Sequence, residues 1–317
     1  MWIKGRGFRY REAIIRWAIT AIGGSNLDQG LAGLAAATMD QDYFSNYAAA
    51  GVSDFYIRNY PQFDRLFLGT NDGKSSYDSF QGGIRLYTSI IKASINYTWS
   101  KSLDNLSVDG NSYVEPLDSF HPNANKGLSD LDRTRVFNSW VIASLPFGYG
   151  RAIGSDASGW KGQLISDWNL GFLVVHESGA RFSVSSGLET FAASVDSLAD
   201  YSGGHDIGGI VRQDRQIYWF TSDEISAFRF PAAGETGTSG RNSFAGPGYF
   251  NMDVSLIKGF RLGETRRLNL RAEAYNVFNN ANFGIPNANL SDPDNFGKIT
   301  TMAGAPRRLQ VGLQFEF

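Results

Sequence analysis

The chain has no cysteine among its 317 residues. Without thiols it can form neither a disulfide framework nor a zinc site built on thiolates, and it has no cysteine nucleophile. The absence also suits passage through an oxidising compartment, where a stray thiol could be cross-linked. Thiol chemistry is therefore excluded as a function of this protein.

Long apolar runs and strong charge are missing as well. No stretch approaches the roughly 18 apolar residues of a membrane-spanning helix. A membrane location would therefore require a closed β-barrel, because only helices and closed barrels satisfy every backbone polar group in lipid. The formal net charge is -2, and no cluster of Lys and Arg resembles a phosphate-binding stripe. Nucleic acid is therefore not expected as a partner.

Residues that would carry catalysis or bind metal are sparse. The three histidines, His121, His176 and His205, are far apart in the sequence, and a metal site would need several ligands brought together. The acidic loops at 71–73, 104–111 and 291–295 lack the Asp-x-Asp-x-Asp-Gly spacing of a calcium loop, and turn chemistry explains them. No nucleophile motif lies between a strand and a helix. We therefore expect no catalytic, cofactor-binding or metal-binding residues.

The sequence is rich instead in alternating strands, and the clearest is the C-terminal one. Its apolar side chains occur at every second position, at Leu309, Val311, Leu313, Phe315 and Phe317. This period of two predicts a strand with one apolar and one polar face. A tilted strand of this length crosses a hydrocarbon layer of roughly 30 Å. The terminal segment therefore predicts the closing strand of a membrane barrel.

Further segments repeat the pattern and bring the expected number of strands to eight. They are residues 52–68, 80–88, 91–100, 133–145, 168–174 with a continuation to 184, 250–256 and 267–274. The connections between them alternate between long and short, as in transmembrane barrels with long extracellular loops and short periplasmic turns. We predict an all-β fold, an antiparallel up-and-down transmembrane β-barrel segment over residues 52–317. Residues 1–51 are unassigned and are interpreted as a truncated or misassigned start.

The polar positions of these strands are candidates for a wall that faces water inside a barrel. They are Arg85, Asn96, Asn169, Asp253, Asn269, Arg271, Glu273, Gln310 and Gln314. The plainer alternative is that they are solvated residues paired across neighbouring strands. Aromatic residues at strand ends are candidates for an interfacial girdle: Tyr97, Trp99, Trp140, Trp168 and Tyr249.

Several longer motifs resemble the C-terminal half of the barrel in Oar-like TonB-dependent receptors, which are outer-membrane proteins of Gram-negative bacteria. The motifs are YTWSKSLDN (97–105), DLDRTRVFNSWVIASLPFG (130–148), GRNSFAGPGYFNMDVSLIKGF (240–260), RLNLRAEAYNVFNNANFGIPN (267–287) and the terminal RRLQVGLQFEF, with RNYPQF (58–63) upstream. The resemblance covers residues 58–317 in the order that the family has them.

The resemblance implies a cell outer membrane location, a non-catalytic receptor or transporter role, and a larger barrel of about 22 strands. Such receptors carry an N-terminal plug and a segment that contacts TonB, and neither is recognisable here. We therefore expect a C-terminal fragment of a larger barrel. Phe317 resembles the signal that the barrel-assembly machinery reads. The implied partners are outer-membrane lipid, that machinery, an unidentified solute and, for a form with a plug, the TonB system.

Two other interpretations remain open at this point. One is a small autonomous eight-stranded outer-membrane barrel with a structural or adhesive role. The other is a soluble, secreted β-sandwich that binds a partner.

Overall fold

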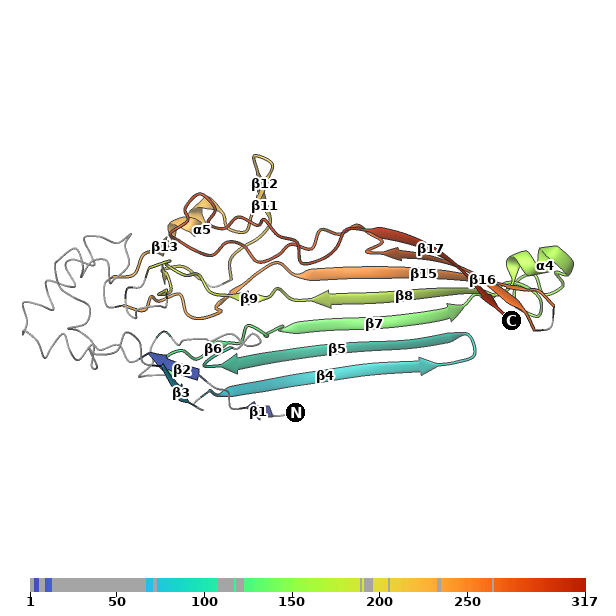
Figure 1. Cartoon of the computed structure of the whole chain (residues 1–317), viewed down its shortest axis with the longest axis horizontal. Helices are drawn as coiled ribbons and strands as arrows, with labels where there is room; N and C mark the ends of the chain where they lie inside the picture. Colours follow the sequence, from blue (N-terminus) through green and yellow to red (C-terminus); the bar gives the residue numbers. More distant parts are fainter. Residues whose placement is uncertain are drawn as a thin grey trace, which may run out of the picture.

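One large antiparallel sheet dominates the computed structural model of the chain (Figure 1). The structure describes residues 3–5, 9–12, 67–70, 73–107, 117, 123–188, 190, 196–204, 206–232, 235–263 and 265–317. The sheet order is β1 (Ile3–Gly5), β4 (Ser75–Tyr87), β5 (Ile91–Asp104), β7 (Arg135–Ser144), β8 (Trp168–Glu177), β15 (Tyr249–Arg261), β16 (Arg267–Tyr275) and β17 (Arg308–Glu316), and the short β6 (Gly127–Leu128) also pairs with β5. The prediction of an all-β, antiparallel up-and-down fold is confirmed.

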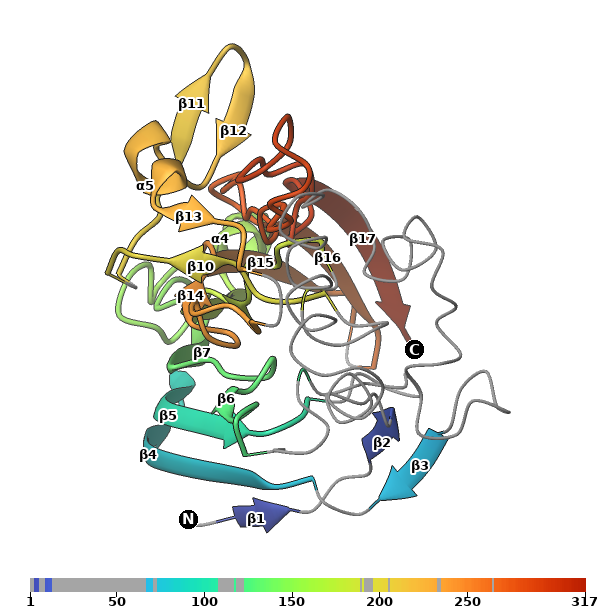
Figure 2. The ribbon, with the colours of Figure 1, turned by 90° about the vertical axis from the view of Figure 1, so that its left-hand side faces the viewer.

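The sheet is curved and open (Figure 2). Its strands follow an arc from β4 to β17, and among the described residues β17 pairs only with β16. The strand predicted at 52–68 differs from the structure where it can be compared. Its last two residues begin β3 (Phe67–Thr70), which pairs with β2 (Arg9–Glu12) in a separate sheet. Residues 52–66, including the RNYPQF motif, lie outside the described residues, as does nearly all of the unassigned 1–51 region.

The connections separate by length onto the two ends of the sheet (Figure 1). The turns at 88–90 and 262–266 lie at one end, together with the C-terminus and the connection at 145–167, which contains α4 (Gly159–Ile165). The described residues of the connections 105–134, 178–248 and 276–307 lie at the other end. No helix in the described part of the chain has the length and apolar character needed to cross a membrane.

The hydrophobic core lies in the long connections and not against the sheet. Its buried members are Phe182, Val184, Ala199, Trp219, Phe220, Phe228, Phe244, Phe296 and Ile299. These residues come from the connections 178–248 and 276–307, whose described residues we call the loop lobe. Phe220 lies near its centre, with ring centroids 5.4 Å from Phe228 and 5.7 Å from Phe296. The lobe thus has the close aromatic packing of a folded unit.

Short elements complete the loop lobe. They are the pairs β9 (Arg181–Phe182) with β14 (Phe244–Ala245) and β10 (Asp200–Tyr201) with β13 (Phe228–Arg229), the hairpin of β11 (Val211–Gln213) and β12 (Gln216–Tyr218), and α5 (Ser222–Ser226).

The predicted continuation of the 168–174 strand to residue 184 stays in the large sheet only as far as residue 177. β8 ends at Glu177, and Phe182 pairs with Phe244 in the loop lobe. Just before this pair, the backbones of Gly179 and Gly246 approach each other closely. A Cβ atom on Gly179 would be 1.7 Å from the Gly246 carbonyl oxygen, so only glycine fits.

We expect Phe220→Ala to destabilise the loop lobe by about 3–5 kcal/mol, because Phe220 is only 2% exposed and its truncation leaves a cavity among four other phenylalanines. Limited proteolysis should then cut within 178–248 much faster than in the wild type. Phe278→Ala is the matched control, because Phe278 is 66% exposed. Equal proteolysis rates for the two variants would contradict a packed lobe.

Candidate functional site

The register of the large sheet brings the nine predicted polar positions onto one face. Residues directly opposite each other in an antiparallel pair share a face, as do alternate residues along a strand. Asn96 lies opposite Asn138, Ser255 opposite Glu273, and Arg271 opposite Gly312. Following these pairs across the sheet places all nine on what we call the polar face: Arg85, Asn96, Asn169, Asp253, Asn269, Arg271, Glu273, Gln310 and Gln314.

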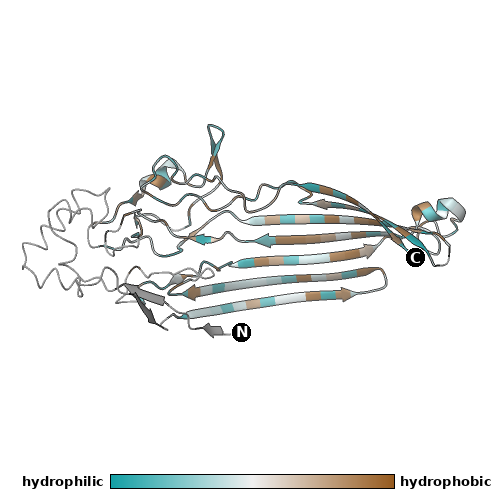
Figure 3. Cartoon of the chain, in the orientation of Figure 1, coloured by the Kyte–Doolittle hydropathy of each residue, from teal (hydrophilic) through white to brown (hydrophobic). Residues whose placement is uncertain are grey.

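The opposite face is apolar over most of the sheet, and we call it the apolar face (Figure 3 shows the alternation along the strands). One row across it runs through Phe172, Val254, Ala274 and Leu309, and the next through Leu170, Leu256, Ala272 and Val311. Val311 is 73% exposed. Phe317 follows the end of β17, and its ring stacks on Phe315 at 6.1 Å. A surface this apolar calls for a non-aqueous environment.

Side chains on the polar face are bonded to one another in short groups. Arg271 and Glu273 form an ion pair at 2.7 Å, and Tyr275 donates its hydroxyl to Glu273 at 3.1 Å. Asn96 donates to Asn138 across two strands at 3.0 Å. Such hydrogen-bonded groups make a polar surface that water can cover at little cost.

The polar face also carries an apolar patch on β7 and β8. Trp140 lies directly opposite Leu173, and Ile142 and Val175 are on the same face. Trp140 and Tyr249 therefore do not belong to an aromatic girdle on the apolar face, contrary to the prediction. Tyr97, Trp99 and Trp168 are on the apolar face, where such a girdle would lie.

Lys258 interrupts the apolar face, and the sequence did not predict its role there. It occupies the position between Leu256 and Phe260, yet it is only 2% exposed. Its ammonium donates hydrogen bonds to the carbonyl oxygens of Gln163 and Gly259, each at 2.6 Å, and to that of Ser166. Two of these acceptors come from the 145–167 connection. No sequence signal links a lysine in one strand to carbonyl groups about 90 residues earlier.

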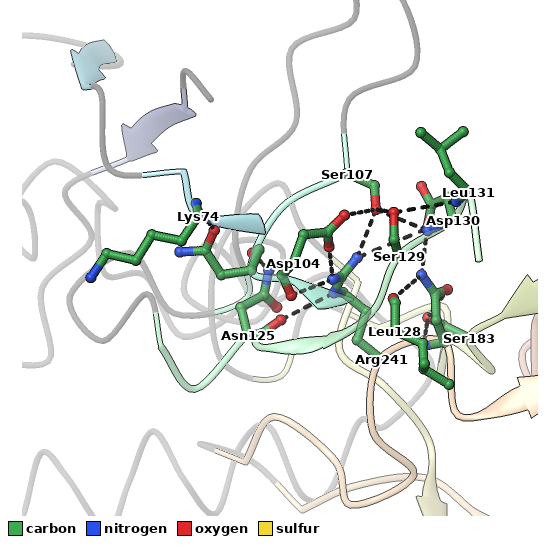
Figure 4. Close-up of polar contacts among 12 residues, drawn as sticks. Lys74, Asp104, Ser107, Asn125, Leu128, Ser129, Asp130, Leu131, Ser183 and Arg241 are labelled. Carbon is green, nitrogen blue, oxygen red and sulfur yellow. Dashed lines mark hydrogen bonds and ion pairs between the residues drawn. The ribbon is translucent and has the colours of Figure 1, made fainter. Parts of the chain in front are cut away.

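A second cluster joins the long connections to the end of the sheet (Figure 4). Arg241 donates to the carbonyl oxygens of Asp104 at 2.8 Å and Asn125 at 3.0 Å, and to the Ser107 hydroxyl at 3.1 Å. It also forms an ion pair with the Asp104 carboxylate. Both side chains are mostly buried, 13% and 7% exposed, so the guanidinium satisfies a carboxylate that water does not reach. We call this the Arg241 clasp.

The backbones of Gly127 and Arg241 lie very close together at the clasp, which requires a glycine at position 127. A Cβ atom on Gly127 would be 2.6 Å from the Arg241 carbonyl oxygen. The neighbouring Asn242 donates to the Leu128 carbonyl at 2.8 Å, and its backbone N–H donates to Ser183 at 2.8 Å. The clasp therefore holds the 178–248 connection against the 105–134 connection.

A second buried carboxylate, that of Asp132, lies beside the clasp, and Asp132 is 1% exposed. Its carboxylate accepts hydrogen bonds from the backbone N–H of Ser102 at 2.8 Å and from Arg181 at 3.2 Å. Arg181 also donates to Thr134 at 2.9 Å. The LDRTR segment thus fixes the start of the loop lobe to the end of β5.

The acidic and histidine residues considered for metal binding either accept hydrogen bonds within their own loops or lie far from one another. Asp292 accepts hydrogen bonds from the side-chain amides of Asn287 and Asn295, so its oxygens serve the turn. His176 is on the apolar face, opposite Phe250. His121 and His205 lie outside the described residues. Among those described, no group of three or more His, Cys, Asp or Glu side chains is placed to hold a metal ion.

Glu224 fixes α5 to the neighbouring loop. Its carboxylate accepts hydrogen bonds from the backbone N–H of Thr221 at 2.7 Å and of Gly208 at 3.1 Å, and Thr221 completes a capping box. Burial alone would raise the pKa of Glu224, but these hydrogen bonds outweigh it, and the pKa lies below its ordinary value.

Comparison with known proteins gives one match. A family model described as an outer membrane beta barrel domain matches residues 22–310, nearly the whole chain. No curated protein and no solved structure matches the chain.

We expect Arg241→Ala to destabilise the contact between the two connections by about 3–5 kcal/mol, because it leaves the buried Asp104 carboxylate without its ion pair. Hydrogen exchange at residues 104–107 and 125–129 should become faster. Arg241→Lys should recover only part of the protection, since an ammonium cannot reproduce the guanidinium fork. The control is Arg229→Ala at an exposed site. Unchanged exchange in Arg241→Ala would show that the clasp does not hold the loops.

Protonation of Glu224 at low pH should weaken the hydrogen bonds that hold α5 to the loop at Gly208. Because the folded-state pKa is lowered, the stability from this carboxylate is complete above its ordinary value of 4.5 and is lost as the pH falls through the folded value. Amide exchange at Gly208 and Thr221, corrected for intrinsic rates, should therefore rise selectively below that pH. Glu224→Gln should exchange faster at neutral pH and lose this acid dependence. An acid response that persists in Glu224→Gln would assign it to another group.

Proposed function

Because the chain belongs to the outer membrane beta barrel domain family, we propose that it forms part of the barrel wall of a TonB-dependent receptor of the Oar-like type. Family membership places the protein in the cell outer membrane. In the proposed role the protein is a non-catalytic receptor or transporter. Its apolar face contacts lipid and its polar face lines an aqueous interior.

One observation carries the proposal, namely the separation of the two faces across seven consecutive strands. Nine polar side chains from β4 to β17 share one face, while the other is apolar except at its margins, at Ser139 in β7 and at Lys258. A membrane barrel needs this arrangement because its outer surface meets lipid and its interior meets water. The extent of the alternation over many strands supports a wall of a wide barrel.

The long connections supply the surface where a solute would first meet the protein. They lie at the end of the sheet that the length rule assigns to the cell exterior. The loop lobe is held by its own aromatic core and by the Arg241 clasp. A surface that is folded in advance binds a solute with less loss of conformational entropy, which supports a recognition role for the lobe.

The proposed partners follow from these surfaces. Outer-membrane lipid would contact the apolar face, and the barrel-assembly machinery would read β17 together with Phe317, which follows it. The TonB system would act on a form that carries a plug, and the solute is unidentified. No nucleic acid is proposed as a partner, because the sequence offers no basic stripe for phosphate.

An autonomous eight-stranded barrel with a structural or adhesive role is the second candidate. The folded loop lobe would suit adhesion, but the open sheet favours the wall of a larger barrel, since closure of eight strands would require β17 to pair across the arc (Figure 2). A soluble sandwich has no support, because the family is one of outer-membrane domains.

The facing of the sheet can be tested with arginine at two adjacent residues of β17. Val311→Arg should destabilise the protein by about 2–4 kcal/mol, because it places a charge on the lipid-facing side near mid-strand. Gln310→Arg should change stability by less than about 0.5 kcal/mol, because Gln310 lies on the polar face opposite Glu273. The measurement is equilibrium unfolding in denaturant after refolding into lipid vesicles. If Gln310→Arg costs as much as Val311→Arg, the facing is wrong.

A further inference from the structure

The 145–167 connection is attached to the apolar face, at the end of the sheet with the short turns. Trp168, on the apolar face, donates its indole N–H to the carbonyl oxygen of Leu164 in α4 at 3.0 Å. Lys258, on the same face, donates to the carbonyl oxygens of Gln163 and Ser166. The C-terminal part of α4 is thereby held on the side of the sheet that the proposed function assigns to lipid.

This connection exposes large apolar side chains although it belongs to a turn region. Trp160 and Leu164 are 73% and 52% exposed and are four residues apart in α4, so they share one side of the helix. The side of α4 that is buried carries Gly162. Tyr149 and Ile153 are also exposed in the same connection. The helix thus turns its small residue inward and its largest ones outward.

Basic residues outnumber acidic ones in the two segments at this end of the sheet. The 145–167 connection and the 258–267 segment contain Arg151, Lys161, Lys258, Arg261, Arg266 and Arg267, against Asp156, Asp167 and Glu264. Asp167 forms ion pairs with Arg261 and Arg267. An excess of positive charge next to exposed Trp and Leu is the composition of a segment that lies in the interface of a phospholipid leaflet.

We propose that the 145–167 connection is an interfacial membrane anchor. It inserts Trp160 and Leu164 into the boundary between headgroups and acyl chains of the periplasmic leaflet, and its basic side chains meet the lipid phosphates. The inference rests on the proposed facing of the sheet, because the anchor continues the apolar face toward the periplasm.

The contacts of Lys258 agree with this boundary position. A lysine on the lipid-facing side would ordinarily extend its ammonium to the headgroups. Here three carbonyl oxygens accept its hydrogen bonds, two of them from the connection that carries the anchor. These hydrogen bonds offset the desolvation of the Lys258 ammonium, and they also hold α4 against the sheet. Lipid is favoured over a protein partner because the exposed side chains continue a surface already assigned to lipid.

The absence of cysteine makes a single-cysteine test possible in the full chain. Trp160→Cys, Val311→Cys and Leu131→Cys are each labelled with an environment-sensitive fluorophore and refolded into vesicles of phosphatidylethanolamine and phosphatidylglycerol. Leu131 is the matched control, because it is 81% exposed in a long connection at the opposite end of the sheet. We expect blue-shifted emission and loss of iodide quenching at 160 and 311, and water-like emission with full quenching at 131.

Shallow and deep nitroxide-labelled lipids then give the depth. The label at 160 should be quenched more by the shallow probe, and the label at 311 more by the deep one. Val311 in lipid with residue 160 in water would overturn the anchor and leave the facing of the sheet intact. Residue 311 in water would overturn the facing itself, and with it the anchor. Shielding at 160 only after addition of a periplasmic protein extract would assign the surface to a protein partner and also overturn the proposal.

Discussion

The cross-strand register is the constraint on which the rest of this structure depends. Backbone N–H and C=O groups in lipid have no water to bond with, so each must pair with a neighbouring strand. Pairing fixes the face of every side chain, because the period along a strand is two and a shift of one residue would exchange the faces. In this chain Glu273 lies opposite Ser255 on one side and Gln310 on the other. The two faces therefore follow from hydrogen bonding together with alternation.

The loop lobe obeys a different rule, since it lies beyond the strands and is stabilised by burial. The large sheet holds few buried apolar side chains, while nearly the whole core is in the lobe. Two buried ion pairs join the large sheet to the loop lobe at the end of β5. They are Arg241 with Asp104 and Arg181 with Asp132. The interaction that stabilises a segment therefore depends on its place along the strand axis. Strand pairing stabilises the sheet, whereas side-chain packing and buried ion pairs stabilise the loop end.

Sequence alone was sufficient for most strands of the large sheet, although not for the 52–68 segment or the start of β4, because alternation is a local property. β5, β15, β16 and β17 begin within one residue of their predicted starts, and the polar face followed from the same pattern. Prediction from the sequence failed where the structure depends on contacts between residues far apart in the chain. Phe182 and Val184 continue the alternation of β8, but Phe182 pairs with Phe244 in the lobe, and the sequence does not reveal this distant partner. Trp140 resembles a girdle residue, and only the register shows that it is on the polar face. The Arg241 clasp links positions 137 residues apart, for which no sequence signal exists.

Lys258 shows where the rule of two faces reaches its limit. An isolated ammonium on a lipid-facing surface is costly near the midplane and much less so near the interface. Lys258 is three residues before the end of β15, opposite both Trp168 and Leu270, and α4 supplies the acceptors that its position in the sheet lacks. A charge on the apolar face is therefore stable here because a turn region folds back over the edge of the wall. In the proposed anchor, this exception lies at the boundary between lipid tails and headgroups, and the anchor would account for the unusually large connection at the end where turns are otherwise short.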